Sequence, residues 1–118
     1  ALPAGCTPLL MGQPLTSRNP TDPPNENLIA LPVAWVKTWT GAEGRTARVF
    51  HSTMGSARDF QCEDMRRLLL NATLWGLGRE AEIRPDLDAR IVGEYAPRRS
   101  GFDYPKLDVR PRPPVEFR

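Results

Sequence analysis

The sequence predicts a small mixed α/β fold, and two neighbouring patterns predict it. The first is a pair of strand-like segments, Pro32 to Thr40 and Thr46 to Thr53, in which β-branched and aromatic residues alternate with others. The second is the segment Gln61 to Leu77, in which apolar residues recur at three- and four-residue steps, as on one face of a helix. At 118 residues the chain holds at most one domain.

Proline confines the predicted core to the middle of the chain. Most of the 13 prolines lie between Pro14 and Pro32 or between Pro97 and Pro114, which leaves about Leu31 to Tyr95 for a core. A core this short buries a modest share of the surface. We therefore expect the C-terminal part of a larger domain in residues 1–96, followed by an extended Pro- and Arg-rich tail in residues 97–118.

The strands are expected in the first half of the chain. A short apolar run, Leu9 to Met11, predicts a brief strand, and the polar, proline-rich Arg18 to Asn27 predicts an irregular connection. In the segment from Pro32 to Thr40, alternation predicts one face with Val33, Trp35 and Lys37 and a second face with Ala34, Val36 and Thr38. The turn Gly41 to Gly44 then joins the two longer segments into a hairpin.

The helix is expected to follow a break at Met54-Gly55-Ser56. Its apolar face is predicted to hold Met65, Leu68, Leu69, Ala72 and Trp75. Arg66 and Arg67 are predicted to point toward water, and Gly76 and Gly78 to end the helix. Beyond it, Arg90 to Tyr95 is expected to add a short strand.

Composition excludes several functional classes. The net charge is +2 with acidic residues interspersed, so no continuous basic face for nucleic acid is predicted. No apolar run is long enough to span a membrane. Cys6 and Cys62 lack metal-ligand spacing, and either a disulfide or two free thiols fits the sequence. No metal and no cofactor is therefore predicted.

Short motifs in a fixed order carry a family resemblance. They are Pro32-Val33-Ala34-Trp35, Arg48-Val49-Phe50, Met54-Gly55, and the helical Arg66-Arg67-Leu68-Leu69-Leu70-Asn71-Ala72 with Trp75, flanked by Leu10 to Leu15 and Ile91 to Tyr95. This ordered set resembles the C-terminal half of bacterial ThuA-like (trehalose-utilisation) domains. The resemblance implies a class I glutamine amidotransferase-like fold, a flavodoxin-like α/β sandwich with a largely parallel sheet. The chain is then a partial domain that supplies a β-hairpin, a core strand and a covering helix.

The loop after the second hairpin strand is the predicted ligand site. In open α/β sheets, ligands bind beyond the carboxyl ends of strands, where loops and helix N-termini present donors. Glycine allows a close approach of the backbone, and the hydroxyl, cationic and carboxylate side chains suit a polyol or an anionic group on a sugar. The predicted ligand-binding residues are Ser52, Thr53, Gly55, Ser56, Arg58 and Asp59.

His51 is the only histidine and hence the only candidate for acid–base catalysis by an imidazole. It follows Val49-Phe50 much as the catalytic histidine follows an aromatic residue in glutamine amidotransferases. The alternative is a hydrogen-bonded structural histidine on the face opposite Phe50. The family's own histidine, directly after the Leu/Met-Gly pair, corresponds to Ser56 here, which is a departure from the family pattern.

The aromatic residues leave further alternatives. Trp35 and Trp75 are expected in the core, whereas Trp39 either stacks on a sugar ring or is an ordinary edge aromatic. The tail aromatics either fold back to line a pocket or stay loosely attached; they are Tyr95, Phe102 and Tyr104.

Two functions therefore stand side by side. One is a ThuA-like domain of carbohydrate metabolism acting on trehalose-type or keto-sugars, and the other is a non-catalytic sugar-binding or interaction module. The expected partners are a small-molecule carbohydrate and either the rest of the domain or further copies of the chain. An exported, periplasmic location and a cytoplasmic one are both compatible with this resemblance.

Overall fold

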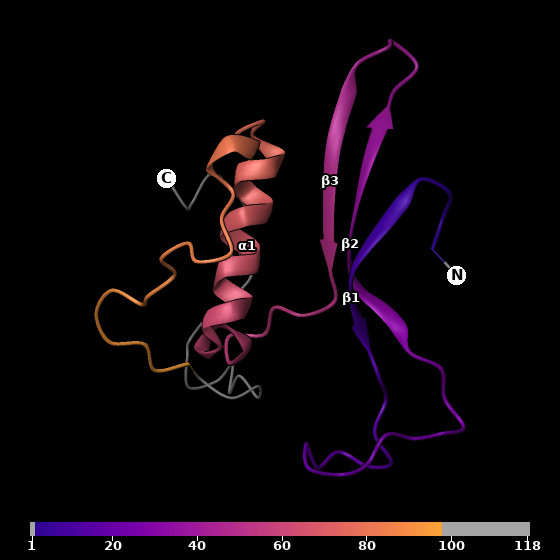
Figure 1. The fold of residues 1–118 in the computed structure, drawn as a ribbon, viewed down its shortest axis with the longest axis vertical. Coiled ribbons are helices and arrows are strands. Elements are labelled where there is room, and N and C mark those ends of the chain that lie inside the picture. The colour runs from indigo at the N-terminus through magenta and orange to yellow at the C-terminus, as the bar shows by residue number, and fades with distance from the viewer. Residues whose placement is uncertain (1, 98–118) are drawn as a thin grey trace, which may run out of the picture.

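The computed structural model describes residues 2–97, which form a mixed α/β unit (Figure 1). Its main elements are strands β1 (Cys6–Gly12), β2 (Leu31–Thr40) and β3 (Thr46–Ser52) and helix α1 (Glu63–Gly76). Short 3₁₀ turns, η1 (Asp59–Gln61) and η2 (Glu80–Glu82), flank the helix. Both hairpin strands and the helix are confirmed, and the strand expected at Leu9 to Met11 is longer than predicted. Phe102, Tyr104 and the rest of the tail from residue 98 lie outside the described residues.

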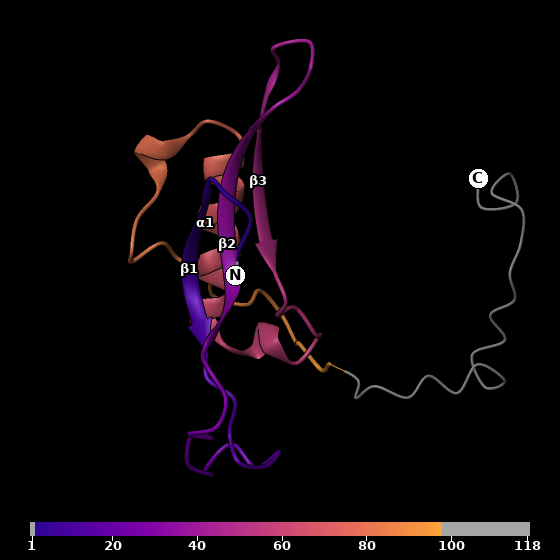
Figure 2. The same cartoon turned by 90° about the vertical axis from the view of Figure 1, so that its right-hand side faces the viewer.

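The strands form an antiparallel sheet in the order β1–β2–β3. Strand β3 pairs with β2 in an unbroken register from Ala34↔Ser52 to Thr40↔Thr46, as expected for a hairpin. The turn is closed by the Gly41 N–H, which donates to the Arg45 carbonyl at 2.9 Å. Figure 2 shows α1 behind the sheet, so the helix covers only one of its faces.

The side chains of β2 alternate between the two faces of the sheet, as predicted. Val36 lines an apolar gap of about 300 Å³ together with Leu68 and Trp75 of α1, so even-numbered residues of β2 face the helix. Trp35, Lys37 and their odd-numbered neighbours lie on the other face. Trp35 is therefore half-buried on the uncovered face and is not enclosed in a core beneath the helix.

The helix begins and ends as its sequence dictates. Cys62 precedes it in an extended conformation, and Glu63 and Asp64 occupy the first turn, where carboxylates favour the positive end of the helix dipole. At the other end Gly78 has φ +75°, its N–H donates to the Trp75 carbonyl, and the Arg79 N–H donates to the Leu74 carbonyl at 2.9 Å. This is a Schellman motif, which requires the left-handed conformation that glycine adopts at little cost.

Arg48 of β3 joins the hairpin to the end of α1. Its guanidinium donates to the Trp75 carbonyl at 2.5 Å, lies 5.4 Å from the centre of the Trp75 ring, and forms an ion pair with Glu80. A cation at this place complements the negative end of the helix dipole.

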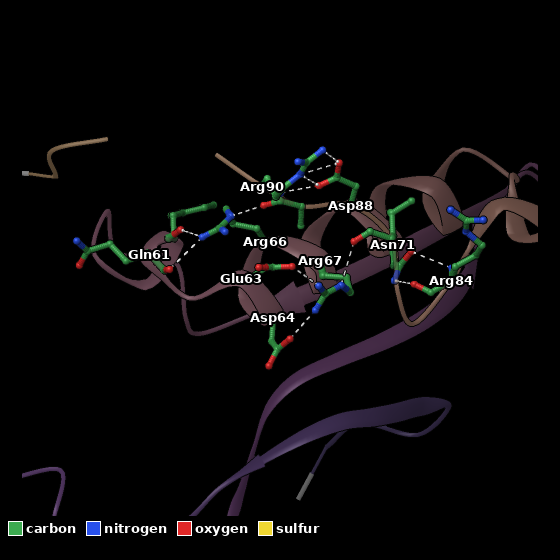
Figure 3. Close-up of polar contacts among 12 residues, drawn as sticks. Gln61, Glu63, Asp64, Arg66, Arg67, Asn71, Arg84, Asp88 and Arg90 are labelled. Atoms are coloured by element: carbon green, nitrogen blue, oxygen red, sulfur yellow. Dashed lines mark hydrogen bonds and ion pairs between the residues drawn. The ribbon is translucent and has the colours of Figure 1, made fainter. Parts of the chain in front are cut away.

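The predicted exposure of Arg66 and Arg67 is wrong. The Arg66 guanidinium donates to the carbonyls of Ala89 at 2.5 Å, Phe60 at 2.6 Å and Gln61 at 3.0 Å. Arg67 donates to the Leu87 carbonyl at 3.0 Å and pairs with carboxylates of the first helical turn (Figure 3). Both arginines face the segment that follows α1, because that segment offers backbone carbonyls and has no regular structure to satisfy them.

The strand expected over Arg90 to Tyr95 is also wrong, because these residues form no strand. The segment returns along α1 as an irregular chain, held by Arg66, Arg67 and Asn71. Asn71 donates to the Arg84 carbonyl at 2.9 Å. Arginine and asparagine side chains thus replace a neighbouring strand as partners of this backbone.

The core within the described residues is small. Its buried apolar side chains are Ala34, Met65 and Ala89, whereas large apolar residues such as Leu31, Trp39 and Leu77 are more than half exposed. A sheet covered on one face and a helix with exposed leucines are consistent with a partial α/β domain. No helix among residues 2–97 is both long and apolar enough to cross a bilayer.

Candidate functional site

The loop after β3 is organised by its own hydrogen bonds. The Ser52 hydroxyl donates to the Met54 carbonyl and accepts from the Met54 N–H, both at 3.1 Å. The Thr53 N–H and hydroxyl both donate to the Val33 carbonyl, at 2.9 and 3.3 Å. These two predicted ligand-binding residues are therefore engaged in turning the chain out of the sheet.

Asp59 closes the same loop from its far side. One carboxylate oxygen accepts the backbone N–H groups of Gly55 and Ser56, each at 2.9 Å. These donations, that of Gly55 first, hold the pKa of the Asp59 carboxyl below its ordinary value. Gly55 has φ +142°, a conformation that residues with side chains rarely adopt, so the glycine serves the turn.

Ser56 and Arg58 remain exposed at the surface of this loop. They flank Ala57, whose carbonyl accepts the Tyr95 hydroxyl at 2.5 Å. The structure thus brings Tyr95 to the predicted loop from a distant part of the chain. For Tyr95, this contact favours the fold-back alternative over loose attachment.

A pocket lies beside this contact. It has a volume of about 330 Å³ and is lined by Phe60, Arg66, Ile91 and Tyr95. Two aromatic rings and an aliphatic side chain make its lining almost wholly apolar, and the Arg66 guanidinium is held by backbone carbonyls. Apolar walls with polar groups near the rim are typical of small-molecule sites.

His51 lies on the other face of the sheet. It stacks on Trp35 with ring centres 4.8 Å apart and an angle of 18° between the ring planes. Phe50, which pairs with Val36, faces α1 and is half-buried, as the alternation predicted. His51 is therefore separated by the sheet from Asp59, Tyr95 and the pocket, and its neighbour is an aromatic ring.

The helix N-terminus does not adjoin the loop directly. The 3₁₀ turn η1 stands between Arg58 and the start of α1 at Glu63, and its last N–H groups donate to carbonyls within the turn. The N–H donors expected from the start of α1 are therefore displaced from the loop, and the Gly55 and Ser56 N–H groups donate to the Asp59 carboxylate.

Other predicted residues are also located. Trp39 is 54% exposed near the hairpin tip, with its ring beside Gly41. Cys6 and Cys62 are both free thiols, which resolves the alternative of a disulfide. In the part of the chain that the structure describes, no three His, Cys, Asp or Glu side chains gather as metal ligands would.

Sequence reasoning missed the residues that build the pocket wall. Arg66 was expected in water, and Phe60 was given no role. The available signal was the adjacent Arg66-Arg67 pair at the start of a helix whose first turn already holds two carboxylates. Arg67 pairs with both of those carboxylates, and Arg66 donates to backbone carbonyls instead.

Comparison with protein-family models, curated proteins and solved structures gives no match to this chain. The ThuA-like resemblance therefore rests on the ordered motifs of the sequence.

Proposed function

We propose that this chain is the C-terminal part of a ThuA-like domain and that it binds a carbohydrate beside the loop Met54 to Asp59. The observation that carries the proposal is the bond from Tyr95 to Ala57, which draws an aromatic wall against the predicted loop. The ordered motifs of the hairpin and the helix support the family. The flavodoxin-like sandwich is part of the same proposal, and its parallel strands belong to the rest of the domain, because the three strands within residues 2–97 pair antiparallel.

The chemistry of the pocket suits a sugar. Phe60 and Tyr95 offer apolar ring surface against which the C–H face of a pyranose packs. The exposed Ser56 and Arg58 flank Ala57, whose carbonyl accepts the Tyr95 hydroxyl. The volume of about 330 Å³ is enough for one sugar ring. Trehalose-type sugars and keto-sugars are the class that the family resemblance favours.

The positions of His51 and Asp59 favour a site that binds a sugar without catalysing a reaction. A general acid or base must reach the reacting atom within hydrogen-bond distance, directly or through one water. His51 lies across the sheet from the pocket and stacks on Trp35. One oxygen of the Asp59 carboxylate accepts two backbone N–H groups of the loop. A catalytic role for His51 is the second candidate, and it requires a substrate on the uncovered face.

Isothermal titration calorimetry of the full chain with trehalose and with keto-hexoses tests the binding. Tyr95→Phe removes the bond to Ala57 and keeps the ring, and Arg58→Gln removes the cation of the loop. Arg45→Gln on the hairpin tip is the control, since Arg45 is 87% exposed. The first two variants should weaken binding, and the control should not. Unchanged affinity in both would remove this pocket as the site.

Turnover tests the second candidate. A keto-sugar consumed at full rate by His51→Ala ends the catalytic case for that residue. Lost turnover with retained sugar affinity instead favours catalysis on the uncovered face.

A further inference from the structure

Strand β3 is an edge of the sheet, and every second residue of it presents its backbone outward. The Thr53 N–H donates to the Val33 carbonyl, which fixes the hydrogen-bonded positions of the pairing. Such positions recur at every second residue of an antiparallel pair, so Val49 and His51 direct their N–H and C=O groups to β2. Arg48 and Phe50 therefore direct theirs away from the sheet.

The two edges of the sheet differ in how they are protected. At the β1 edge, Pro8 has no N–H group, and the register shifts on both sides of Leu10. Proline and bulges are devices that block pairing at an exposed edge. Strand β3 has neither, since it contains no proline and its register with β2 is unbroken. In the described part of the chain no other element pairs with it.

Within residues 2–97, no strand or helix lies beside the outer edge of β3. Figure 2 shows α1 behind the sheet and no described element beyond the outer side of β3. Val49, at the centre of the strand, is 38% exposed on the uncovered face. A regular edge with an exposed apolar residue at its middle favours the addition of another strand.

We propose that β3 pairs with β3 of a second copy of this chain, antiparallel about a two-fold axis at Val49. An isologous contact needs a surface that is complementary to itself, and an antiparallel strand edge meets that need. Centring on Val49 sets each Arg48 opposite the partner's Phe50 and each Thr46 opposite the partner's Ser52, so outward-directed groups meet. It also avoids an Arg48–Arg48 contact, since like charges directly opposite each other are destabilising.

The two-fold axis is perpendicular to the sheet, so both α1 helices lie on the same face of a continuous sheet. The two Val49 side chains meet on the other face as a non-hydrogen-bonded pair, in which side chains approach most closely. This pairing is independent of the carbohydrate site, because the pocket at Phe60 and Tyr95 is not part of the β3 edge.

Sedimentation velocity of the full chain over a range of concentrations tests the pairing. The wild type should form a dimer. Val49→Lys sets two cations at the axis and should weaken the dimer by roughly tenfold or more. The control is Leu31→Lys, which adds the same charge at an exposed position of β2 outside the pairing with β3, and which should remain dimeric.

Amide hydrogen exchange of the wild type gives a second reading that needs no variant. The Arg48 and Phe50 amides should gain protection as protein concentration rises, whereas those of Val49 and His51 should be protected throughout. A wild type that stays monomeric, a dimer that Leu31→Lys dissociates as readily as Val49→Lys, or Arg48 and Phe50 amides that exchange freely at high concentration would each overturn the proposal.

Discussion

Replacing Arg66 by methionine is expected to release the segment after α1. The guanidinium holds three backbone carbonyls, those of Ala89, Phe60 and Gln61. Ala89 is 4% exposed, so its carbonyl has little access to water once the guanidinium is gone. Gln61 is exposed and Phe60 is half-buried, so their carbonyls rehydrate more readily.

The size of the loss in the free energy of unfolding follows from the exposure of these three carbonyls. A hydrogen bond from a charged donor contributes about 1.5–3 kcal/mol net, and a buried acceptor left unpaired costs about 1–3 kcal/mol. Counting mainly the Ala89 carbonyl, Arg66→Met should lower the free energy of unfolding by about 3 kcal/mol. Arg66→Lys should lose about half of that, because an ammonium group lacks the planar fork that reaches several carbonyls at once.

Urea unfolding at a fixed protein concentration, followed by circular dichroism and tryptophan fluorescence, measures the change. The control is Arg84→Met, since the Arg84 side chain is 64% exposed and its ion pair with Asp86 spans 3.7 Å, so the expected effect is within about 0.5 kcal/mol. Hydrogen exchange near Ala89 should accelerate in Arg66→Met alone. If Arg66→Met unfolds within about 0.5 kcal/mol of the wild type, the assigned anchoring role is wrong.

Three further predictions concern the ends of the helix and the response to acid. Gly78→Ala should lower the free energy of unfolding by roughly 1–2 kcal/mol, because alanine is strained in the left-handed conformation that Gly78 adopts at φ +75°. Gly76→Ala, a change inside the helix with open space around the new methyl group, should raise the free energy of unfolding in the same urea assay, and equal effects of the two would refute this reading. Arg48→Met should lower the free energy of unfolding by about 1–2 kcal/mol, because it removes the contacts with the helix end and with the Trp75 ring. Arg45→Met should leave this free energy almost unchanged. Urea unfolding of both variants checks this, and an equal loss in Arg45→Met would argue against a specific anchor. Hydrogen bonds from Arg90 lower the pKa of Asp88 from 3.8 to about 2. Because the folded pKa lies below the unfolded one, the stabilisation is complete above about pH 4 and is lost as the pH falls toward about 2. Asp88→Asn should remove that part of the acid dependence of unfolding, and an unchanged pH profile would contradict the assignment.

The hairpin and the helix could be predicted because their signals are local. Alternation from Pro32 to Thr40 and a helical repeat around Leu68 and Trp75 are properties of neighbouring residues, and the structure confirms both. The path of the chain after Gly78 could not be predicted in this way. It depends on hydrogen bonds from Arg66 and Arg67 to backbone carbonyls about 20 residues away. No periodic sequence pattern in that segment indicates which carbonyls accept these bonds.

The candidate site was predicted in part. Glycine and polar residues marked the loop after β3, and alternation put His51 opposite Phe50, in agreement with the structure. Composition alone could not tell which polar groups bind a ligand and which shape the loop. Asp59 and Thr53 have the residue types of a sugar site, yet their hydrogen bonds are made within the protein.

The chain presents two surfaces on which a sugar could stack, and the proposed site is on one of them. One is the pocket of Phe60 and Tyr95 beside the loop, and the other is the uncovered face with Trp35, Trp39 and His51. They lie on opposite sides of the sheet, so a ligand at one leaves the other unchanged.

Nuclear magnetic resonance titration of the isotope-labelled full chain with trehalose and keto-hexoses distinguishes the two surfaces most directly. We expect shifts of the Phe60 and Tyr95 ring signals and of the Ser56 and Arg58 amides, with the Trp35 and His51 ring signals unmoved. Shifts confined to Trp35, Trp39 and His51, or none at saturating sugar, would contradict this expectation.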